Sequence, residues 1–214
     1  MFKVNQIEKY FAERKGDMGV LVETVQTLRR ESFKKLDSIQ QLKKAQLNEY
    51  IALLHSQMHI FKDDPYSAQA LVEFNRAFEV GSGTTSTPGW KTLVQKYDAR
   101  MKDIMRDNGW YDLFLIHPEG DIVYTAGKES DLGMSIPDSN LKNSSIGQAY
   151  KRARSMGSDD IAISDFAPYD PSGGVPAAFM IARMHDSKGS LIGFAGLQIP
   201  LEKNFKLHAY TNNS

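Results

Sequence analysis

The longest regular pattern in this sequence is an apolar stripe that extends from residue 1 to residue 62. This stretch contains no proline, and its only glycines are Gly16 and Gly19. Apolar side chains recur in it at intervals of four and three residues, which places them on one face of a helix. They form two runs: Ile7, Phe11, Met18, Leu21, Val25, Leu28, and then Leu47, Ile51, Leu54, Met58, Phe61. The phase shifts between the runs, so we predict one long helix, or two helices joined by a bend near residues 29–35.

A stripe of this length needs an apolar partner. If the stretch is helical throughout, it forms a rod of ~80 Å, whereas a domain of about 150 residues has a radius of gyration of only ~15 Å. Three partners are possible for the stripe: the same helix in a second copy, a helix predicted over residues 90–104, or the stretch folded back on itself. The weak similarity of QIEKYF at residues 6–11 to QLNEYI at residues 46–51 favours the fold-back.

Two shorter helices follow the long stretch. Asp64 can cap a helix that begins at Pro65 and extends to Phe78. Residues 79–89, EVGSGTTSTPG, have the composition of a loop. Apolar residues at helical spacing over 90–104 predict the next helix, and Asn108-Gly109 is a suitable end for it.

Beyond Gly109 the apolar pattern changes from a helical period to that of strands. Residues 110–117 and 121–127 predict a hairpin, residues 145–155 a helix, and residues 161–166, 176–184 and 190–199 three further strands. Helices followed by strands indicate an α+β fold, with an antiparallel sheet of about five strands. We therefore divide the chain into a helical region, 1–108, a sheet module, 109–201, and a C-terminal tail, 202–214.

The composition excludes several classes of function. The absence of cysteine rules out disulfides, thiol catalysis and cysteine-ligated metals. The 26 basic and 26 acidic residues balance, so nothing in the charge indicates a nucleic-acid partner. No apolar run approaches the ~20 residues that span a bilayer. We predict no cofactor.

Catalytic and metal-binding motifs are incomplete. Ser139 and Lys142 match S-x-x-K, but the other elements of penicillin-recognising enzymes are missing, so a hydrolase is a weak alternative. His55 and His59 have the spacing of zinc ligands on a helix, but no third ligand is evident. We predict neither a catalytic nor a metal site.

Polar and aromatic residues gather on the predicted sheet instead. Phe179 and Arg183 have the same parity on one strand and should face the same side. Aromatic walls with a few convergent polar groups are typical of a small-molecule pocket, although each residue alone is equally compatible with a core or surface role. The candidate ligand-binding residues are Tyr124, Lys128, Asp165, Tyr169, Asp170, Phe179, Arg183 and Gln198.

Three segments resemble a known family. YDLFLIHPEGDIVYTAGKESDLGMS at 111–135, SDFAPYDPSGGVPAAFMIA at 164–182 and GSLIGFAGLQIPL at 189–201 are similar to the Cache, or PAS-like, extracytoplasmic sensor module. QIEKYFAERKGDM and LDSIQQLKKAQLNEYI are similar to the signalling helix that precedes such modules. The resemblance implies a PAS-like fold and a periplasmic sensor domain of a membrane-anchored chemotaxis receptor. A sensor of a histidine kinase or membrane cyclase is the alternative, and a ligand-free helical interaction module is another.

The resemblance also guides the expected ligand and assembly. Relatives that bind amino acids have a P-Y-x-D element and a last-strand aspartate, whereas this chain has Pro171 and Gln198 at those positions. We therefore expect a small carboxylate or polar metabolite, bound by Arg183, Tyr169 and Gln198. Relatives of this kind signal as dimers, so we predict a parallel homodimer along the long helix, with these contact residues: Leu47, Ile51, Leu54 and Met58.

Overall fold

The computed structural model describes residues 2–200. Backbone contacts divide the chain into two compact units, Met1–Ile51 and Ala52–Ser214. The predicted tail, 202–214, and Leu201 lie outside the described residues. The division of function at residue 108 stays a prediction.

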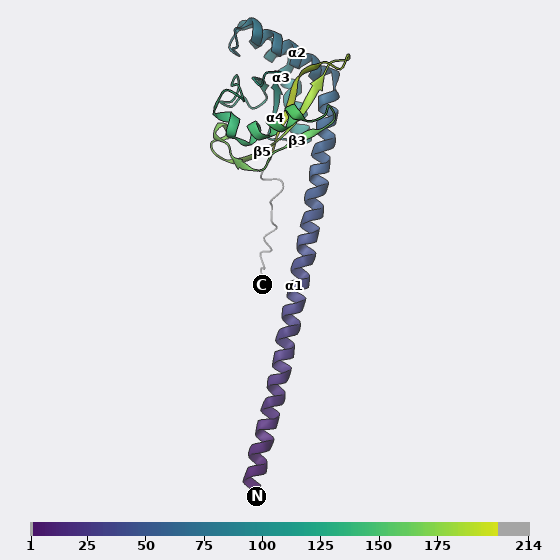
Figure 1. Ribbon diagram of the computed structural model, residues 1–214, viewed down its shortest axis with the longest axis vertical. Coiled ribbons are helices and arrows are strands. Elements are labelled where there is room, and N and C mark those ends of the chain that lie inside the picture. Colours follow the sequence, from purple (N-terminus) through teal and green to yellow (C-terminus); the bar gives the residue numbers. More distant parts are fainter. Residues whose placement is uncertain (1, 201–214) are drawn as a thin grey trace. The chain divides into compact units, whose positions relative to one another are not determined.

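The first unit is a continuous part of helix α1, which extends over Phe2–Asp63 (Figure 1). Residues 29–35 are helical, so the phase shift in the apolar stripe does not break the helix, and the fold-back does not occur. The large apolar side chains from Val4 to Leu47 in this unit are exposed. Among the described residues, no helix combines the length and hydropathy needed to cross a membrane.

The second unit begins with the last turns of α1 and contains helices α2 (Pro65–Val80) and α3 (Pro88–Asn108). The predicted cap is confirmed, because the Asp64 carboxylate accepts a hydrogen bond from the Ser67 N–H and Pro65 occupies the first helical position. Gly109 ends α3 in the left-handed conformation at φ 70°, as its position after Asn108 predicts.

An antiparallel sheet fills the rest of this unit. Its strands are β1 (Asp112–Ile116), β2 (Ile122–Thr125), β3 (Ile161–Ile163), β4 (Ala167–Pro168), β5 (Pro176–His185) and β6 (Leu191–Ile199). The order is β2-β1-β6-β5-β3, with β4 paired to β5. The connection after β2 contains the short helix η1 (Asn140–Asn143) and helix α4 (Ser145–Ser155), and η2 (Asp170–Ser172) follows β4. The α+β prediction is confirmed, with the two-residue β4 added to the expected five strands.

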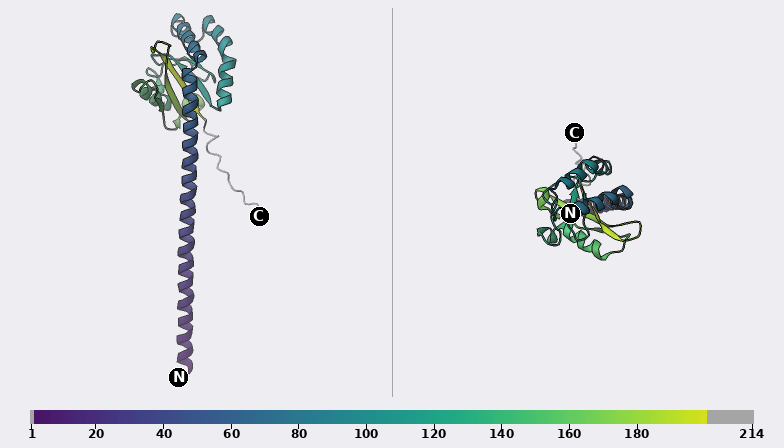
Figure 2. Two further views of the ribbon diagram at one scale, coloured as in Figure 1. Left: turned by 90° about the vertical axis from the view of Figure 1, so that its right-hand side faces the viewer. Right: turned by 90° about the horizontal axis from the view of Figure 1, so that it is seen from above.

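The sheet is covered on both faces (Figure 2). On one face, α4 packs over Phe114, Phe179 and Phe194. On the other face, Phe74 of α2 contacts the ring of Tyr124, with 4.9 Å between the ring centroids. Because both faces are buried, β5 has an almost continuous apolar sequence instead of an alternating one.

The last turns of α1 belong to this core. Leu54 is 1% exposed and Met58 is fully buried, whereas Leu47 is 49% exposed. The prediction that Leu54 and Met58 form a contact with a second copy is therefore wrong, because their apolar surface is already buried within the second unit. The periodic pattern did not distinguish the two parts, since core packing and self-association favour the same helical spacing.

Candidate functional site

The least expected feature of the sheet is a buried aspartate in its first strand. Asp112 is fully buried and lies opposite Gln198 of β6. Its Oδ1 accepts hydrogen bonds from the Leu113 N–H at 2.6 Å and the Gly127 N–H at 2.8 Å. Its Oδ2 is buried and has no hydrogen-bond partner among the described residues. One oxygen of the carboxyl group is therefore satisfied by the backbone, and the other is not.

A second buried aspartate lies nearby. Asp131, in the connection after β2, is fully buried, and its Oδ2 accepts a hydrogen bond of 2.6 Å from the hydroxyl of Tyr169. Its Oδ1 lacks a partner within the described chain. The Tyr169 ring packs edge-on against Phe179, with 4.8 Å between the centroids. The aromatic pair thus forms an apolar wall beside the carboxyl group.

Polar side chains of three further segments join these groups. The Gln198 amide donates to the Ser172 hydroxyl at 3.2 Å, and that hydroxyl donates to Glu129 at 2.6 Å. The other oxygen of Glu129 accepts a 3.0 Å hydrogen bond from the hydroxyl of Tyr111. The Gln198 Oε1 is buried and, within residues 2–200, has no donor. We call the whole set the acidic cluster: Tyr111, Asp112, Glu129, Asp131, Tyr169, Ser172, Phe179 and Gln198.

The pKa values of the cluster reflect burial next to like charges. The pKa of Asp112 is raised to about 7, mainly by burial and to a smaller extent by the negative charges of Asp131 and Glu129, against the lowering effect of its two backbone hydrogen bonds. Burial also raises the pKa of Asp131, despite the hydrogen bond from Tyr169. Burial and the Asp131 charge raise the pKa of the Tyr169 hydroxyl. Near neutral pH the carboxyl group of Asp112 is therefore only partly ionised.

This arrangement is suited to a group that donates hydrogen bonds. Three oxygens of the acidic cluster, on Asp112, Asp131 and Gln198, are buried without a hydrogen-bond donor among the described residues, and an ionised carboxylate or an amide oxygen can only accept. A buried acceptor without a donor costs about 1–3 kcal/mol, and more for a charged group. An ammonium group would supply three donors and a positive charge, which also lowers the cost of ionising the carboxyl groups.

The structure brings together only part of the set predicted from the sequence. Tyr169, Phe179 and Gln198 lie in the acidic cluster. Asp165 lies between β3 and β4, and Asp170 directly follows Tyr169 after β4, but the side chains of both aspartates are exposed. Their role in binding a ligand stays a prediction.

Tyr124 and Lys128 lie on the opposite face of the sheet. The Tyr124 hydroxyl donates to Asp98 of α3 at 3.0 Å, and the Lys128 ammonium is paired with the same carboxylate. Although burial raises it, hydrogen bonds from Lys102 and Lys128 hold the pKa of Asp98 below its usual range. The prediction that these two residues share a pocket with Tyr169 is wrong. Parity shows which residues of one strand share a face, but it does not show which residues of another strand point to that same face of the sheet.

Arg183 shares the face of Phe179, as its parity predicts, but not its surroundings. Four residues along β5 correspond to about 13 Å. Its guanidinium donates at 2.8 Å to the carbonyl oxygen of Met156, at the end of α4. Arg183 is thus engaged at the other end of the strand, and it does not supply a positive charge to the acidic cluster.

Asp112, Glu129 and Asp131 were not among the candidates from the sequence. The signal for Asp112 was present: it is the one acidic residue in WYDLFLIH, an otherwise apolar segment. A charged residue within a buried strand is costly unless it has a purpose. Asp131 had no such signal, because KESDLG has the composition of an ordinary exposed turn.

Comparison with known proteins gives matches among solved structures alone. No protein-family model matches the sequence, and no curated protein does. The sensor domain of the Vibrio cholerae histidine kinase DctB is similar at 13% identity and a TM-score of 0.49, over 81% of this chain and 59% of that one. The sensory domain of the Campylobacter jejuni chemoreceptor Tlp3 has 18% identity and a TM-score of 0.39, over 72% and 65%. The periplasmic domain of V. cholerae LuxQ has 12% identity and a TM-score of 0.37, over 74% of this chain and 60% of that one.

The names of the three matched structures describe those proteins only. Two are named sensor or sensory domains, and the third is named a periplasmic domain. This chain spans less than two thirds of the length of each. At these identities and TM-scores, the likeness carries no argument about ligands, partners or output.

Proposed function

We propose that this chain is the extracytoplasmic, ligand-binding sensor region of a membrane-anchored bacterial receptor. A chemotaxis receptor is the first candidate, and a histidine kinase or membrane cyclase is the alternative. The observation that carries the proposal is the acidic cluster, in which Asp112, Asp131 and Gln198 each keep a buried acceptor without a donor. Most buried polar groups in a protein core are hydrogen-bonded, and this cluster brings together three that are not, whereas the other such atoms of the described residues, on Asn75, Tyr97, Ser145 and Arg183, belong to four separate elements. The sequence resemblance to Cache modules supports the same function.

The chemistry of the cluster favours a small ligand with an amine. The sequence suggested a carboxylate or polar metabolite held partly by Arg183. A carboxylate would meet the carboxyl groups of Asp112 and Asp131, while Arg183 is about 13 Å along the strand from Phe179. An ammonium group satisfies the unpaired acceptors, and Phe179 and Tyr169 provide an apolar wall for the rest of the molecule.

A thermal-shift screen tests this proposal with matched probes. We would compare three probes that share an isopropyl group: isobutylamine carries an amine, isobutyrate a carboxylate, and L-valine both. We expect the two amines to raise the melting temperature, because a ligand at 100 times its Kd stabilises the folded state by about 2.7 kcal/mol. Stabilisation by isobutyrate alone would contradict the amine.

Two variants locate the binding. Asp131→Asn keeps the size of the side chain and removes its charge, so it should abolish the shift that the amines cause. Asp138→Asn is the matched control, since Asp138 is outside the cluster and its carboxylate accepts from Ser135 at 3.2 Å. Equal effects of the two variants would refute the acidic cluster as the ligand site.

We also propose that the exposed stripe of α1 contacts the same stripe of a second copy. Leu21, Val25 and Leu28 are each more than half exposed, and an apolar surface of this extent is unusual without a partner. A parallel dimer covers it and couples a ligand-induced movement of the helix to a membrane anchor.

Sedimentation tests the dimer. We expect the triple variant Leu21→Ser, Val25→Ser, Leu28→Ser to be monomeric where the wild type is dimeric. Glu23→Ser with Arg30→Ser, on the opposite side of the helix, is the control and should leave the mass unchanged. A wild type that remains monomeric at high concentration would refute self-association.

A further inference from the structure

A concave site lies beside α4, and no residue of the acidic cluster takes part in it. It is a groove of about 460 Å³, lined by Ile136, Pro137, Lys142, Gly147, Tyr150, Lys151, Arg154 and Ser155. Its volume lies within the usual range of small-molecule sites, about 300–1,000 Å³. Tyr150 packs edge-on against Phe194, with 5.1 Å between the ring centroids. Phe194 precedes Gln198 by four residues, or about 13 Å along β6, so the two sites are separate.

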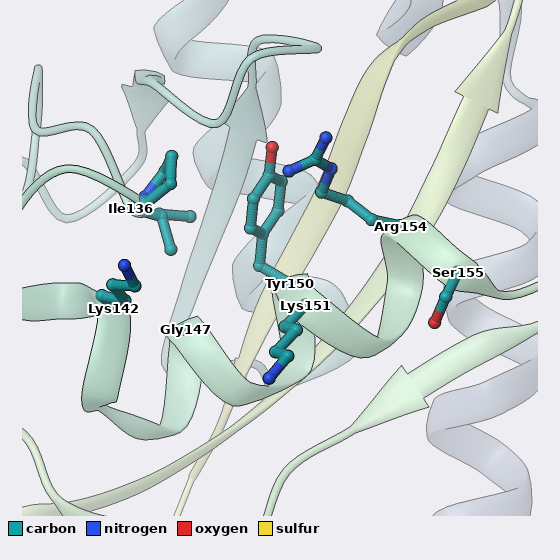
Figure 3. Close-up of a pocket in the computed structure, with 8 residues that line it drawn as sticks. Ile136, Lys142, Gly147, Tyr150, Lys151, Arg154 and Ser155 are labelled. Atoms are coloured by element: carbon teal, nitrogen blue, oxygen red, sulfur yellow. The ribbon is translucent and has the colours of Figure 1, made fainter.

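The groove has an apolar wall beside basic side chains. Figure 3 shows the ring of Tyr150 between the side chain of Ile136 and the guanidinium of Arg154. Ile136 is 1% exposed and Tyr150 is 3% exposed, so both are fixed parts of the core. The Tyr150 hydroxyl donates to the Pro118 carbonyl at 3.2 Å, and the Arg154 guanidinium lies 5.9 Å from the ring centroid. The wall is therefore held in place from within the fold.

The basic groups around this wall have no acidic partners. Lys142, Lys151 and Arg154 form no salt bridge among residues 2–200, whereas Lys96, Lys102 and Lys128 are each paired with a carboxylate. Lys151 also borders a neighbouring hollow with Arg152, whose guanidinium donates to the Ile163 carbonyl at 2.6 Å. Unpaired positive charges around a hollow attract anions.

The acidic groups nearby form no direct ion pair with these cations within the described residues. Burial is the largest cause of the raised pKa of the Tyr150 hydroxyl. The positive charge of Arg154 lowers this pKa, and the negative charges of Glu119 and Asp121 raise it. Asp121 lies 3.8 Å from the His117 ring. The Asp138 carboxylate, next to Pro137, is engaged with Ser135.

We infer that this groove binds a small organic anion, whose apolar body lies against Ile136 and Tyr150 and whose acidic group is attracted by the basic side chains that line the groove, Lys142, Lys151 and Arg154. The site is independent of the acidic cluster, which requires a ligand of opposite charge. Two sites of opposite charge on one unit would allow the receptor to respond to two classes of compound.

Calorimetric titration with naphthalene-2-sulfonate tests this inference on the whole chain, because this probe has an apolar body and a charge that does not vary with pH. We expect binding at millimolar concentration or below, and no binding of the neutral naphthalene-2-sulfonamide. Lys142→Gln with Arg154→Gln should weaken binding about tenfold, as expected for the loss of two exposed ion pairs. Lys91→Gln with Lys188→Gln is the control, because it removes the same charge from exposed positions elsewhere.

Amide chemical shifts of Ile136 and Gly147 complete the test, since they report on the groove directly. Equal weakening by the two double variants, or shifts confined to α1, would overturn the proposal. Asp131→Asn should leave sulfonate binding unchanged while it abolishes the effect of amines. The proposals for the two sites are therefore tested independently.

Discussion

Asp112 should make the unliganded protein less stable as the pH rises from 5 to 8. Its pKa is raised from 3.8 to about 7 by burial in the folded chain. Between these values the folded state binds a proton that the unfolded state has released, so stability falls with increasing pH in this window. The variant Asp112→Asn removes the titrating group and keeps an oxygen for the Leu113 and Gly127 N–H groups.

The size of the effect follows from the interval between the two pKa values. Each pKa unit corresponds to about 1.36 kcal/mol, so the rise from 3.8 to about 7 corresponds to about 4 kcal/mol in the free energy of unfolding. The protein has lost this stability in full well above pH 7. Asp131 shifts in the same direction and adds to the dependence. His185 opposes it, because burial lowers its pKa, which makes the folded state more stable as the pH rises through 6.5. The difference between wild type and Asp112→Asn cancels the contribution of His185 and includes the electrostatic coupling of Asp112 to Asp131.

Urea denaturation at pH 5 and pH 8 measures this difference. We expect the wild type to lose stability between the two values and Asp112→Asn to lose markedly less. Asp165→Asn is the control, since this side chain is exposed, and it should follow the wild type. A wild type that is as stable at pH 8 as at pH 5, or a variant with the same decline, would refute the burial of an acid in β1.

Three further substitutions test the packing around the site. Met58→Ala should lower the free energy of unfolding in urea by about 2–5 kcal/mol, because the side chain is fully buried. A change near zero would contradict this burial and favour a contact of Met58 with a second copy. Gly127→Ala should lower the melting temperature, since a Cβ there would lie 2.7 Å from Oδ2 of Asp112, and an unchanged value would contradict this close approach. Trp90→Phe removes the 2.8 Å hydrogen bond to the Val123 carbonyl and should cost about 1 kcal/mol, whereas a neutral result would mean that the bond contributes nothing.

The sequence by itself determined the local structure. Helical spacing, the cap at Asp64 with Pro65, and the left-handed end at Gly109 depend on neighbours within a few residues, and the structure has each of them where the sequence predicts it. The boundaries of α4, Ser145–Ser155, also match the sequence prediction. Local backbone and side-chain preferences suffice for these features.

Only the tertiary structure decided which residues meet across the sheet. Asp112 and Gln198 face each other because β1 pairs with β6, and this pairing joins residues far apart in the chain. The same packing places Tyr124 with Asp98 on one face and Tyr169 with Asp131 on the other. It also buries Met58 while Leu47, on the same stripe, remains exposed. The periodic pattern shows that a side chain is suited to an apolar partner, but which partner it has depends on the long-range arrangement of the strands and helices.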